Sequence, residues 1–215
     1  MPIGSEVDNM EYHLKAPLTE ADVRKLNIGD TVYLSGEVFT GRSRIHRYIF
    51  DEDHTLPPEA ARRGAMVHVG PIMVKTESGW ELVSFMPTSS LRFEKWGADS
   101  VEKWGLRIIV GKTTMGSDTL DAMQKFGCVH VSPQCVSPNL WHDSITIQGV
   151  ELFEELGSIE ACWLLELDEL GPFIVDMDSH GRNYFDELDV HVAKQRDAVL
   201  QSMGVPEDFT PTKLY

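Results

Sequence analysis

The chain has 215 residues, of which 42% are hydrophobic and 25% are charged. This length is sufficient for one globular domain with its own core, and the composition excludes the disordered and fibrous classes of protein. The 34 acidic residues outnumber the 19 basic ones and give a net charge of -15, which disfavours binding to nucleic acid or to an anionic lipid surface.

The sequence also bears on the compartment in which the protein works. No stretch approaches the roughly 20 apolar residues of a membrane-spanning helix, and the first residues lack the basic and apolar regions of a signal peptide. Three cysteines, Cys128, Cys135 and Cys162, leave one thiol unpaired in any disulfide scheme, which is typical of a reducing compartment. We therefore expect a soluble, cytoplasmic protein with free thiols and with no membrane or nucleic-acid partner.

After a polar lead-in, the chain alternates between helix and strand patterns. Thr19 and Asp22 have the spacing of a capping box and predict a short helix that ends near Gly29. A β-rich strand is expected over 31–39, and an amphipathic helix over 43–52 follows it after a turn of small residues. A strand thus leads through a turn into a helix.

The same order of strand, turn and helix recurs along the rest of the chain. Further strands are expected over 65–70, 80–85, 106–110, 128–132 and 173–178, with a hydrophobic run over 161–165 and with helices from Leu91 and over 119–126. From Asp186 the pattern is that of a polar helix that ends before Pro206. These patterns predict a mixed α/β domain followed by a C-terminal helix and tail.

The first segment that indicates chemistry is Thr40-Gly41-Arg42-Ser43-Arg44-Ile45-His46. A helix that begins near Ser43 would place Arg42 at its start and His46 one turn later on the same face. The free N–H groups and the dipole of such a helix start favour an anion, and the Arg42 guanidinium can bind a carboxylate through two hydrogen bonds. The alternative interpretation is a solvated basic helix with a surface histidine.

The second segment is Met86-Pro87-Thr88-Ser89-Ser90-Leu91-Arg92, which follows a predicted strand. Its three consecutive hydroxyl groups can either cap the following helix or bind the oxygen atoms of a substrate. Capping needs only one hydroxyl, and Arg92 returns to the same face three or four residues later. Both uses remain open, and Thr88, Ser89 and Arg92 are candidates for contact with a substrate.

The third segment, Val110-Gly111-Lys112-Thr113-Thr114-Met115-Gly116, carries a lysine between a hydrophobic strand and a helix. A nucleotide-binding P-loop would require a glycine at position 106, where this chain has Leu106. Nucleotide hydrolysis is therefore not expected. Lys112 remains a candidate for binding a small anionic substrate.

A loose group of possible metal ligands consists of Cys128, His130 and Cys135. Its spacing matches neither a zinc site nor an iron–sulfur motif, so we expect buried structural thiols and no metal held by this chain. His68 and His180 have no partner that is visible in the sequence, and both are interpreted as structural.

Taken together and in this order, the three segments resemble the β component of class I fumarases and L(+)-tartrate dehydratases. The T-x-R-x-x-x-H stretch of that family corresponds to Thr40, Arg42 and His46. Its G-P-T-T-S-x-R-M stretch corresponds to residues 86–93, and its V-G-K-G-x-M-G stretch corresponds to residues 110–116. The chain departs from this pattern at Ser43 in place of Asp, at Ser89 in place of Thr, and at Met86 and Thr113 in place of Gly.

The resemblance covers residues 17–190 and implies a swivelling β/β/α domain, an α/β fold with a mixed sheet core and flanking helices. We expect a lead-in over 1–16 before this domain and a C-terminal helix and tail over 191–215 after it. The resemblance also implies a β subunit that adds or eliminates water on a hydroxy-dicarboxylate, tartrate to oxaloacetate or malate to fumarate. The required [4Fe–4S] cluster would be bound by the cysteines of a partner α subunit, in an α2β2 hetero-oligomer. Alone, the chain would form a homodimer and bind no cofactor.

Elimination of water needs a Lewis acid for the departing hydroxyl, a base for the carbon-bound proton, and cations for the charge that spreads into the carboxylate. The partner's iron would supply the first of these. We expect Arg42, Arg92 and Lys112, together with Ser89, to bind the substrate. His46, whose unperturbed pKa is about 6.5, and Thr88 are both candidates for the catalytic base.

Two other functions remain open. Since the chain lacks the family's Asp at position 43 and Gly at position 86, it could be a non-catalytic carboxylate-binding or regulatory swivelling domain. A third interpretation is an anion-binding enzyme of unrelated mechanism.

Overall fold

A computed structural model describes residues 9–134, 137–206, 208–210 and 212 of the chain. These residues belong to two units, and the boundary lies between Asn183 and Tyr184. The larger unit contains the β-sheet and every predicted site residue, and the smaller one contains the C-terminal helix. Each unit is described by itself.

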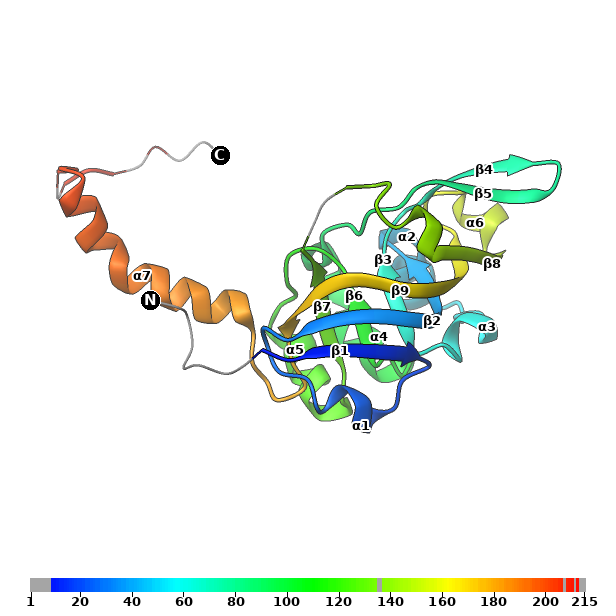
Figure 1. Cartoon of the computed structure of the whole chain (residues 1–215), viewed down its shortest axis with the longest axis horizontal. Helices are drawn as coiled ribbons and strands as arrows, with labels where there is room; N and C mark the ends of the chain where they lie inside the picture. Colours follow the sequence, from blue (N-terminus) through cyan, green and yellow to red (C-terminus); the bar gives the residue numbers. More distant parts are fainter. Residues whose placement is uncertain (1–8, 135–136, 207, 211, 213–215) are drawn as a thin grey trace. The chain divides into compact units, whose positions relative to one another are not determined.

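The larger unit is built on a seven-stranded mixed sheet with the order β1-β2-β3-β6-β7-β9-β8 (Figure 1). Its strands are β1 (Glu11–Ala16), β2 (Thr31–Gly41), β3 (Ala65–His68), β6 (Ile108–Val110), β7 (Val129–Pro133), β8 (Ile145–Glu151) and β9 (Cys162–Met177). The neighbouring strands from β1 to β7 are parallel, whereas β9 is antiparallel to β7, β8 and β2. Because β9 pairs with β2 as well as with β7, the sheet closes on itself. A separate hairpin consists of β4 (Ile72–Thr76) and β5 (Gly79–Ser84).

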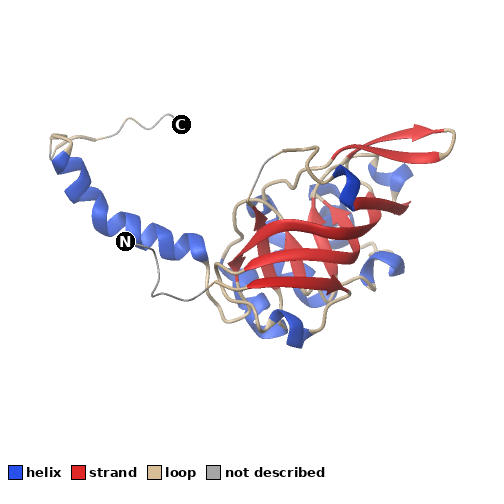
Figure 2. Cartoon of the chain, in the orientation of Figure 1, coloured by secondary structure: helices blue, strands red, loops and turns tan. Residues whose placement is uncertain are grey.

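Short helices connect the strands and flank the sheet (Figure 2). They are α1 (Glu20–Val23), α2 (Ser43–His46), α3 (Pro58–Ala61), α4 (Glu94–Lys103), α5 (Ser117–Phe126) and α6 (Phe153–Leu156). A π-helix over Arg47–Asp51 continues α2, and 3-10 turns occupy Ser90–Phe93 and His142–Ser144. Thr19 and Asp22 form the predicted capping box at α1. The predicted α/β fold with a sheet core and flanking helices is confirmed, and its description as a swivelling domain stays a prediction.

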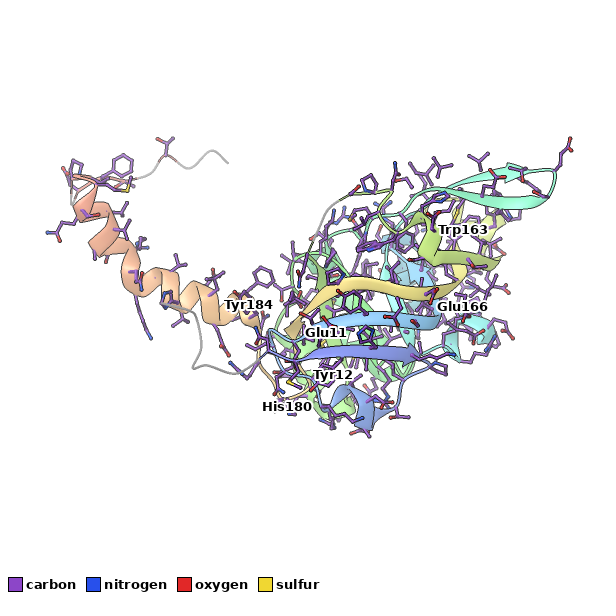
Figure 3. The ribbon with its side chains drawn as sticks, viewed as in Figure 1. Glu11, Tyr12, Trp163, Glu166, His180 and Tyr184 are labelled. Carbon is purple, nitrogen blue, oxygen red and sulfur yellow. The ribbon has the colours of Figure 1, made fainter. Side chains whose placement is uncertain are left out.

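Two clusters of buried side chains lie on opposite faces of the sheet. Trp163 on β9 belongs to the first cluster, whereas its neighbours Cys162 and Leu164 belong to the second (Figure 3). This division follows from the alternation of side chains along a strand. The second cluster also includes Val101 of α4 and Met123 of α5, so these helices cover the second face. Because α4 and α5 cover a face of the sheet, the ends of its strands stay accessible to the connecting loops.

The sequence patterns missed or divided some strands. No element was predicted over 11–16, where β1 forms an edge strand whose alternate residues, including Glu11, are exposed (Figure 3). Such a polar edge strand lacks the continuous apolar pattern of a buried strand. A strand end was expected before Pro172, but β9 continues through it as one strand of 16 residues. Pro172 is tolerated because it lies in a β-bulge, where the pairing of β9 with β2 shifts register between Leu34 and Val32 and requires no ladder hydrogen bond from its nitrogen.

The smaller unit contains α7 (Tyr184–Ser202), and the helix predicted from Asp186 is thereby confirmed. Its described side chains are at most partly buried. None of the helices in the described ranges is both long and apolar enough to cross a bilayer. The predicted domain boundaries at 17 and 190 stay predictions.

Candidate active site

The three segments singled out in the sequence lie at the side of the sheet where its parallel strands end. We call this side the carboxyl edge and the opposite side, where these strands begin, the amino edge. Arg42 follows directly after the end of β2, and Lys112 lies two residues after the end of β6. Thr88 N donates a hydrogen bond of 2.6 Å to the carbonyl of His68, the last residue of β3. Since β2, β3 and β6 are parallel, their carboxyl ends share an edge, which is the usual place for a ligand site in sheets of this kind.

Backbone hydrogen bonds tie the second segment to the third. Ser89 and Lys112 form an isolated parallel β-bridge. Lys112 N donates to Thr88 O at 2.9 Å, and Ser90 N donates to Lys112 O at 2.9 Å. The separation between Thr88 and Lys112 is therefore set by main-chain pairing and not by flexible side chains.

The hydroxyl groups of the second segment point to different partners. Arg92 Nη2 donates to Thr88 Oγ1, and Ser89 Oγ lies 2.9 Å from Thr113 Oγ1. Ser89 occupies the cap position of the following 3-10 turn, yet its side chain makes no capping hydrogen bond. The capping interpretation is therefore wrong, because other side chains take up these hydroxyls.

Two of the predicted cations have no carboxylate partner. Within the described residues, neither Arg92 nor Lys112 forms an ion pair. Arg92 is exposed and Lys112 is half-buried. In a chain with a net charge of -15, unpaired cations on adjacent loops create a local positive potential that favours a small anion.

Arg42 is held against the end of β3 and beside an acidic residue. A Cβ atom on Gly70 would lie 2.6 Å from Arg42 Nη1, so the glycine leaves the space that the guanidinium fills. Arg42 Nε is buried, has no hydrogen-bond partner in the part of the chain that the structure describes, and lies 3.7 Å from Glu160 Oε1. The other oxygen, Glu160 Oε2, accepts a hydrogen bond of 2.8 Å from Arg44 N at the start of α2.

The role of Glu160 corrects one prediction. The helix start at Ser43 was expected to offer its N–H groups to an anion, but the carboxylate of Glu160 already occupies Arg44 N. No local pattern predicts this contact, because Glu160 lies 116 residues from Arg44 along the chain. Glu160 brings a carboxylate next to Ser43, the position where the resembling family carries Asp.

His46 is buried under the site. Its ring stacks on Phe93 and Trp96, with centroids 5.3 and 5.8 Å apart, and its Nδ1 lies 2.7 Å from Arg42 O. Burial lowers the pKa of His46 to about 4, although the hydrogen bond to the Arg42 carbonyl opposes this shift. The ring is therefore neutral near pH 7 and donates from Nδ1 to Arg42 O. The expectation of a surface histidine is wrong, and its catalytic role stays a prediction.

Thr113 explains one departure from the family pattern. Its φ angle is 65°, in the left-handed region that favours glycine. The family carries Gly at this position, which adopts that conformation without steric cost. Thr113 instead adds a hydroxyl that reaches Ser89.

The described cysteines do not suit an iron–sulfur cluster. Cys128 and Cys162 are both buried, and burial raises the pKa of Cys162 to about 12 and that of Cys128 further still. A cluster is held by several thiolates that converge on it. Cys135 lies outside the described residues. Among the residues that are described, no three His, Cys, Asp or Glu side chains are arranged to hold a metal ion.

Sequence reasoning also missed contacts of the buried histidines. His68 was interpreted as having no partner, but its Nδ1 lies 2.8 Å from Ser90 Oγ. His130 was considered with the cysteines, but its ring nitrogens contact Asp176 and Ser90 instead. The sequence feature that could have indicated these buried contacts is a polar residue within an otherwise apolar strand.

Comparison with known proteins agrees with the resemblance seen in the motifs. The sequence model of the family described as "Fumarase C-terminus" matches residues 3–188. A protein of Escherichia coli (strain K12) named L(+)-tartrate dehydratase subunit beta is 32% identical over 198 residues, which cover 90% of this chain and 96% of that protein. A Geobacillus stearothermophilus protein named "Putative fumarate hydratase class I" is 36% identical over 178 residues, which cover 82% of this chain.

The two relatives differ in how much of their own length is matched. The chain spans about a third of the Geobacillus stearothermophilus protein, with 34% of that protein covered. The Escherichia coli protein is matched along nearly its whole length. Because the family match spans most of the sequence and a relative of similar length shares it, the chain belongs to the Fumarase C-terminus family.

Proposed function

We propose that this chain is the β subunit of a [4Fe–4S]-dependent hydro-lyase that adds or eliminates water on a small hydroxy-dicarboxylate such as tartrate or malate. The observation that carries the proposal is the grouping of Arg92 and Lys112 on loops joined by the Ser89–Lys112 bridge, with no carboxylate partner for either among the described residues. Two carboxylates of a substrate need at least two such cations at a fixed separation.

Three cations of this chain would bind the substrate. Arg42, Arg92 and Lys112 each supply charge-assisted hydrogen bonds, worth about 1.5–3 kcal/mol apiece when the partner is a carboxylate. These bonds strengthen as the carbon-bound proton leaves and negative charge spreads into the adjacent carboxylate, so they lower the barrier as well as bind. Ser89 would contact a substrate oxygen from the same loop.

Thr88 and His46 would act in different ways. Arg92 donates to Thr88 Oγ1, and hydrogen bonding to an oxygen favours its anionic form, which suits a hydroxyl that exchanges a proton with the substrate. His46 is 1% exposed and donates to the Arg42 carbonyl, which suits a residue that fixes the backbone before α2. We assign proton transfer to Thr88 and positioning to His46.

The catalytic site would be completed by another polypeptide. No three His, Cys, Asp or Glu side chains of the described residues converge as metal ligands, so we assign the cluster to a partner α subunit with cysteines of its own. The name of the Escherichia coli relative, subunit beta, supports a separate partner. The Geobacillus stearothermophilus relative, of which the match covers only 34%, supports a fused arrangement of the same parts. We propose a cytoplasmic α2β2 hetero-oligomer.

The test is co-expression of the chain with a candidate cluster-binding subunit under anaerobic conditions, followed by assays on tartrate, malate, fumarate and mesaconate. We expect turnover of at least one of these by the complex, and a colourless, inactive protein when the chain is purified alone. A brown preparation of the single chain, with the absorbance of a cluster, would contradict the division of roles. A complex that binds a dicarboxylate without converting it would favour the non-catalytic alternative.

A further inference from the structure

A continuous line of buried polar side chains lies beneath the candidate site. His68 Nδ1 is 2.8 Å from Ser90 Oγ, and Ser90 Oγ is 2.8 Å from His130 Nε2. His130 Nδ1 is 2.5 Å from Asp176 Oδ1, and the other oxygen of Asp176 contacts Ser132 Oγ. All of these side chains except Ser132 are at most 2% exposed. We call these five residues the buried relay.

The hydrogen bonds of the buried relay run in one direction. The Asp176 carboxylate only accepts, so His130 donates from Nδ1, and in a neutral ring Nε2 then accepts. Ser90 then gives its hydroxyl hydrogen to His130 and accepts from His68 Nδ1. Burial lowers the pKa of His68 well below its usual value, so that ring is neutral and its Nδ1 carries the hydrogen. One tautomer of each ring satisfies the contacts from His68 to Asp176, and the single hydroxyl hydrogen of Ser132 faces both Asp176 Oδ2 and Thr113 O.

The backbone is shaped to fit the buried relay. The pairing of β7 with β9 shifts register between His130 and Val131, which leaves Asp176 out of the ladder and lets its side chain turn to His130. On the other side, a Cβ atom on Gly111 would lie 1.8 Å from Ser90 Oγ and 3.0 Å from His130 Nε2. Only glycine allows the third segment to pass this close to the relay.

Both ends of the buried relay reach the substrate loops. Ser90 follows Ser89 directly, and its backbone N–H donates to Lys112 O. At the other end, Ser132 Oγ lies 2.9 Å from Thr113 O. His68 also holds the second segment through its carbonyl, which accepts from Thr88 N. The relay therefore braces the loops of Thr88 and Lys112 from below without facing the solvent.

We propose that His68, Ser90, His130, Asp176 and Ser132 are positioning residues that fix the separation of Thr88 and Lys112 for catalysis. This inference rests on the proposed function, because it gives the relay a role in that reaction. The buried histidines do not exchange protons with the substrate; their fixed tautomers orient the loops that do.

The first test compares two buried serines in the assembled complex. Ser90→Ala removes the hydroxyl that joins the two rings, whereas Ser100→Ala removes an equally buried hydroxyl that bonds only Trp96 O in α4. We expect kcat to fall by about 10-fold or more in Ser90→Ala and by less than about twofold in Ser100→Ala, with similar losses of thermal stability in both. Equal kcat values in the two variants would overturn the proposal.

A double-mutant cycle tests whether the residues act as one unit. His130 bonds both Ser90 and Asp176, so it links the two side chains most directly. In a connected relay, Ser90→Ala combined with Asp176→Asn should lower kcat little more than the worse single variant does. Multiplicative losses would show two independent effects and would overturn the proposal.

The third measurement needs no enzyme activity. Nitrogen-15 NMR of the full chain alone should show His130 protonated at Nδ1 with Nε2 as an acceptor, and Ser90→Ala should shift the His130 Nε2 and His68 Nδ1 signals. An Nε2-protonated His130, or ring signals that Ser90→Ala leaves unchanged, would overturn the relay itself. If the ring signals are as expected but the wild-type complex converts no dicarboxylate, the relay exists and the proposed function fails together with the positioning role.

Discussion

Basic residues lie at both edges of the parallel part of the sheet, but at the carboxyl edge a paired cation, Arg42, occurs together with cations that have no ion-pair partner among the described residues. Near the amino end of β3, Arg62 makes hydrogen bonds of 2.7 Å to both Glu37 and Glu59. At the carboxyl edge, Arg92 and Lys112 have no ion-pair partner among the described residues. A cation that already has its carboxylate stabilises its own surroundings, whereas one that lacks a carboxylate is available to a ligand.

The largest expected effect comes from removing a cation at the carboxyl edge. Lys112→Ala should lower kcat/KM of the assembled complex by about 100-fold or more, because it removes a charge from the region where negative charge develops in the reaction. Arg62→Ala, the matched control at the amino edge, should change kcat/KM by less than about twofold. Similar losses of kcat/KM in Lys112→Ala and Arg62→Ala would contradict the proposed difference between the two edges.

Burial of His46 makes the stability of the chain depend on pH. The pKa of His46 is depressed from 6.5 to about 4 by burial, so the unfolded chain binds more protons than the folded chain between these values. Its contribution to stability is present above pH 6.5 and is lost as the pH falls toward 4, by up to about 3 kcal/mol in all. His68 contributes in the same direction.

This behaviour predicts a change in slope for one variant. In urea unfolding followed between pH 7 and pH 4, His46→Gln should reduce the dependence of the unfolding free energy on pH by up to about one proton. His13→Gln is the control, because His13 is exposed and its pKa is raised by Glu169 and Glu11, so its contribution is lost with rising pH instead. If the unfolding free energy of His46→Gln depends on pH as that of the wild type does, the pKa of His46 is not depressed in the folded chain.

A smaller effect is expected from the carboxylate beside Arg42. Glu160→Gln keeps an oxygen that can accept from Arg44 N but removes the charge 3.7 Å from Arg42 Nε. We expect KM for the dicarboxylate to change by roughly 3- to 10-fold with little change in kcat, because the guanidinium loses its orientation and not its charge. Glu59→Gln, which alters a pair at the amino edge, should leave KM unchanged.

The smallest effect is expected at Thr113. Thr113→Ser keeps the hydroxyl that lies 2.9 Å from Ser89 Oγ and should preserve kcat/KM within about twofold. Thr113→Gly removes the hydroxyl but suits the φ angle of 65°, so it should raise the thermal stability slightly while loosening Ser89. A lower melting temperature in Thr113→Gly would show that the hydroxyl outweighs the backbone strain.

Most of the fold was accessible from local patterns, and the exceptions have physical causes. A short apolar run such as that of β6 predicts a buried strand, because a helix would need a longer periodic pattern. The edge strand β1 carries mainly polar side chains and depends on β2 for its pairing, so its own residues do not reveal it. The closure of the sheet through β2 and β9 is set by contacts between distant segments, which no local pattern records.

The candidate site divides in a similar way. Arg42, Arg92 and Lys112 could be found because each belongs to a short motif at the end of a predicted strand. Glu160 and Asp176 could not, because their partners lie 116 and 46 residues away along the chain. Residues that hold the site in place become visible only in the fold, whereas residues proposed to face the ligand can be recognised from local sequence motifs.

The most direct measurement of the central claim is the mapping of dicarboxylate binding to one edge of the sheet. In a proton–nitrogen NMR titration of the full chain with L(+)-tartrate at constant ionic strength, the amide signals of 88–92 and 111–113 should shift, and Lys112→Ala should abolish these shifts. Acetate at the same concentration should have a much weaker effect. Shifts centred on Arg62 and Arg63, or no shifts at the carboxyl edge, would contradict the claim.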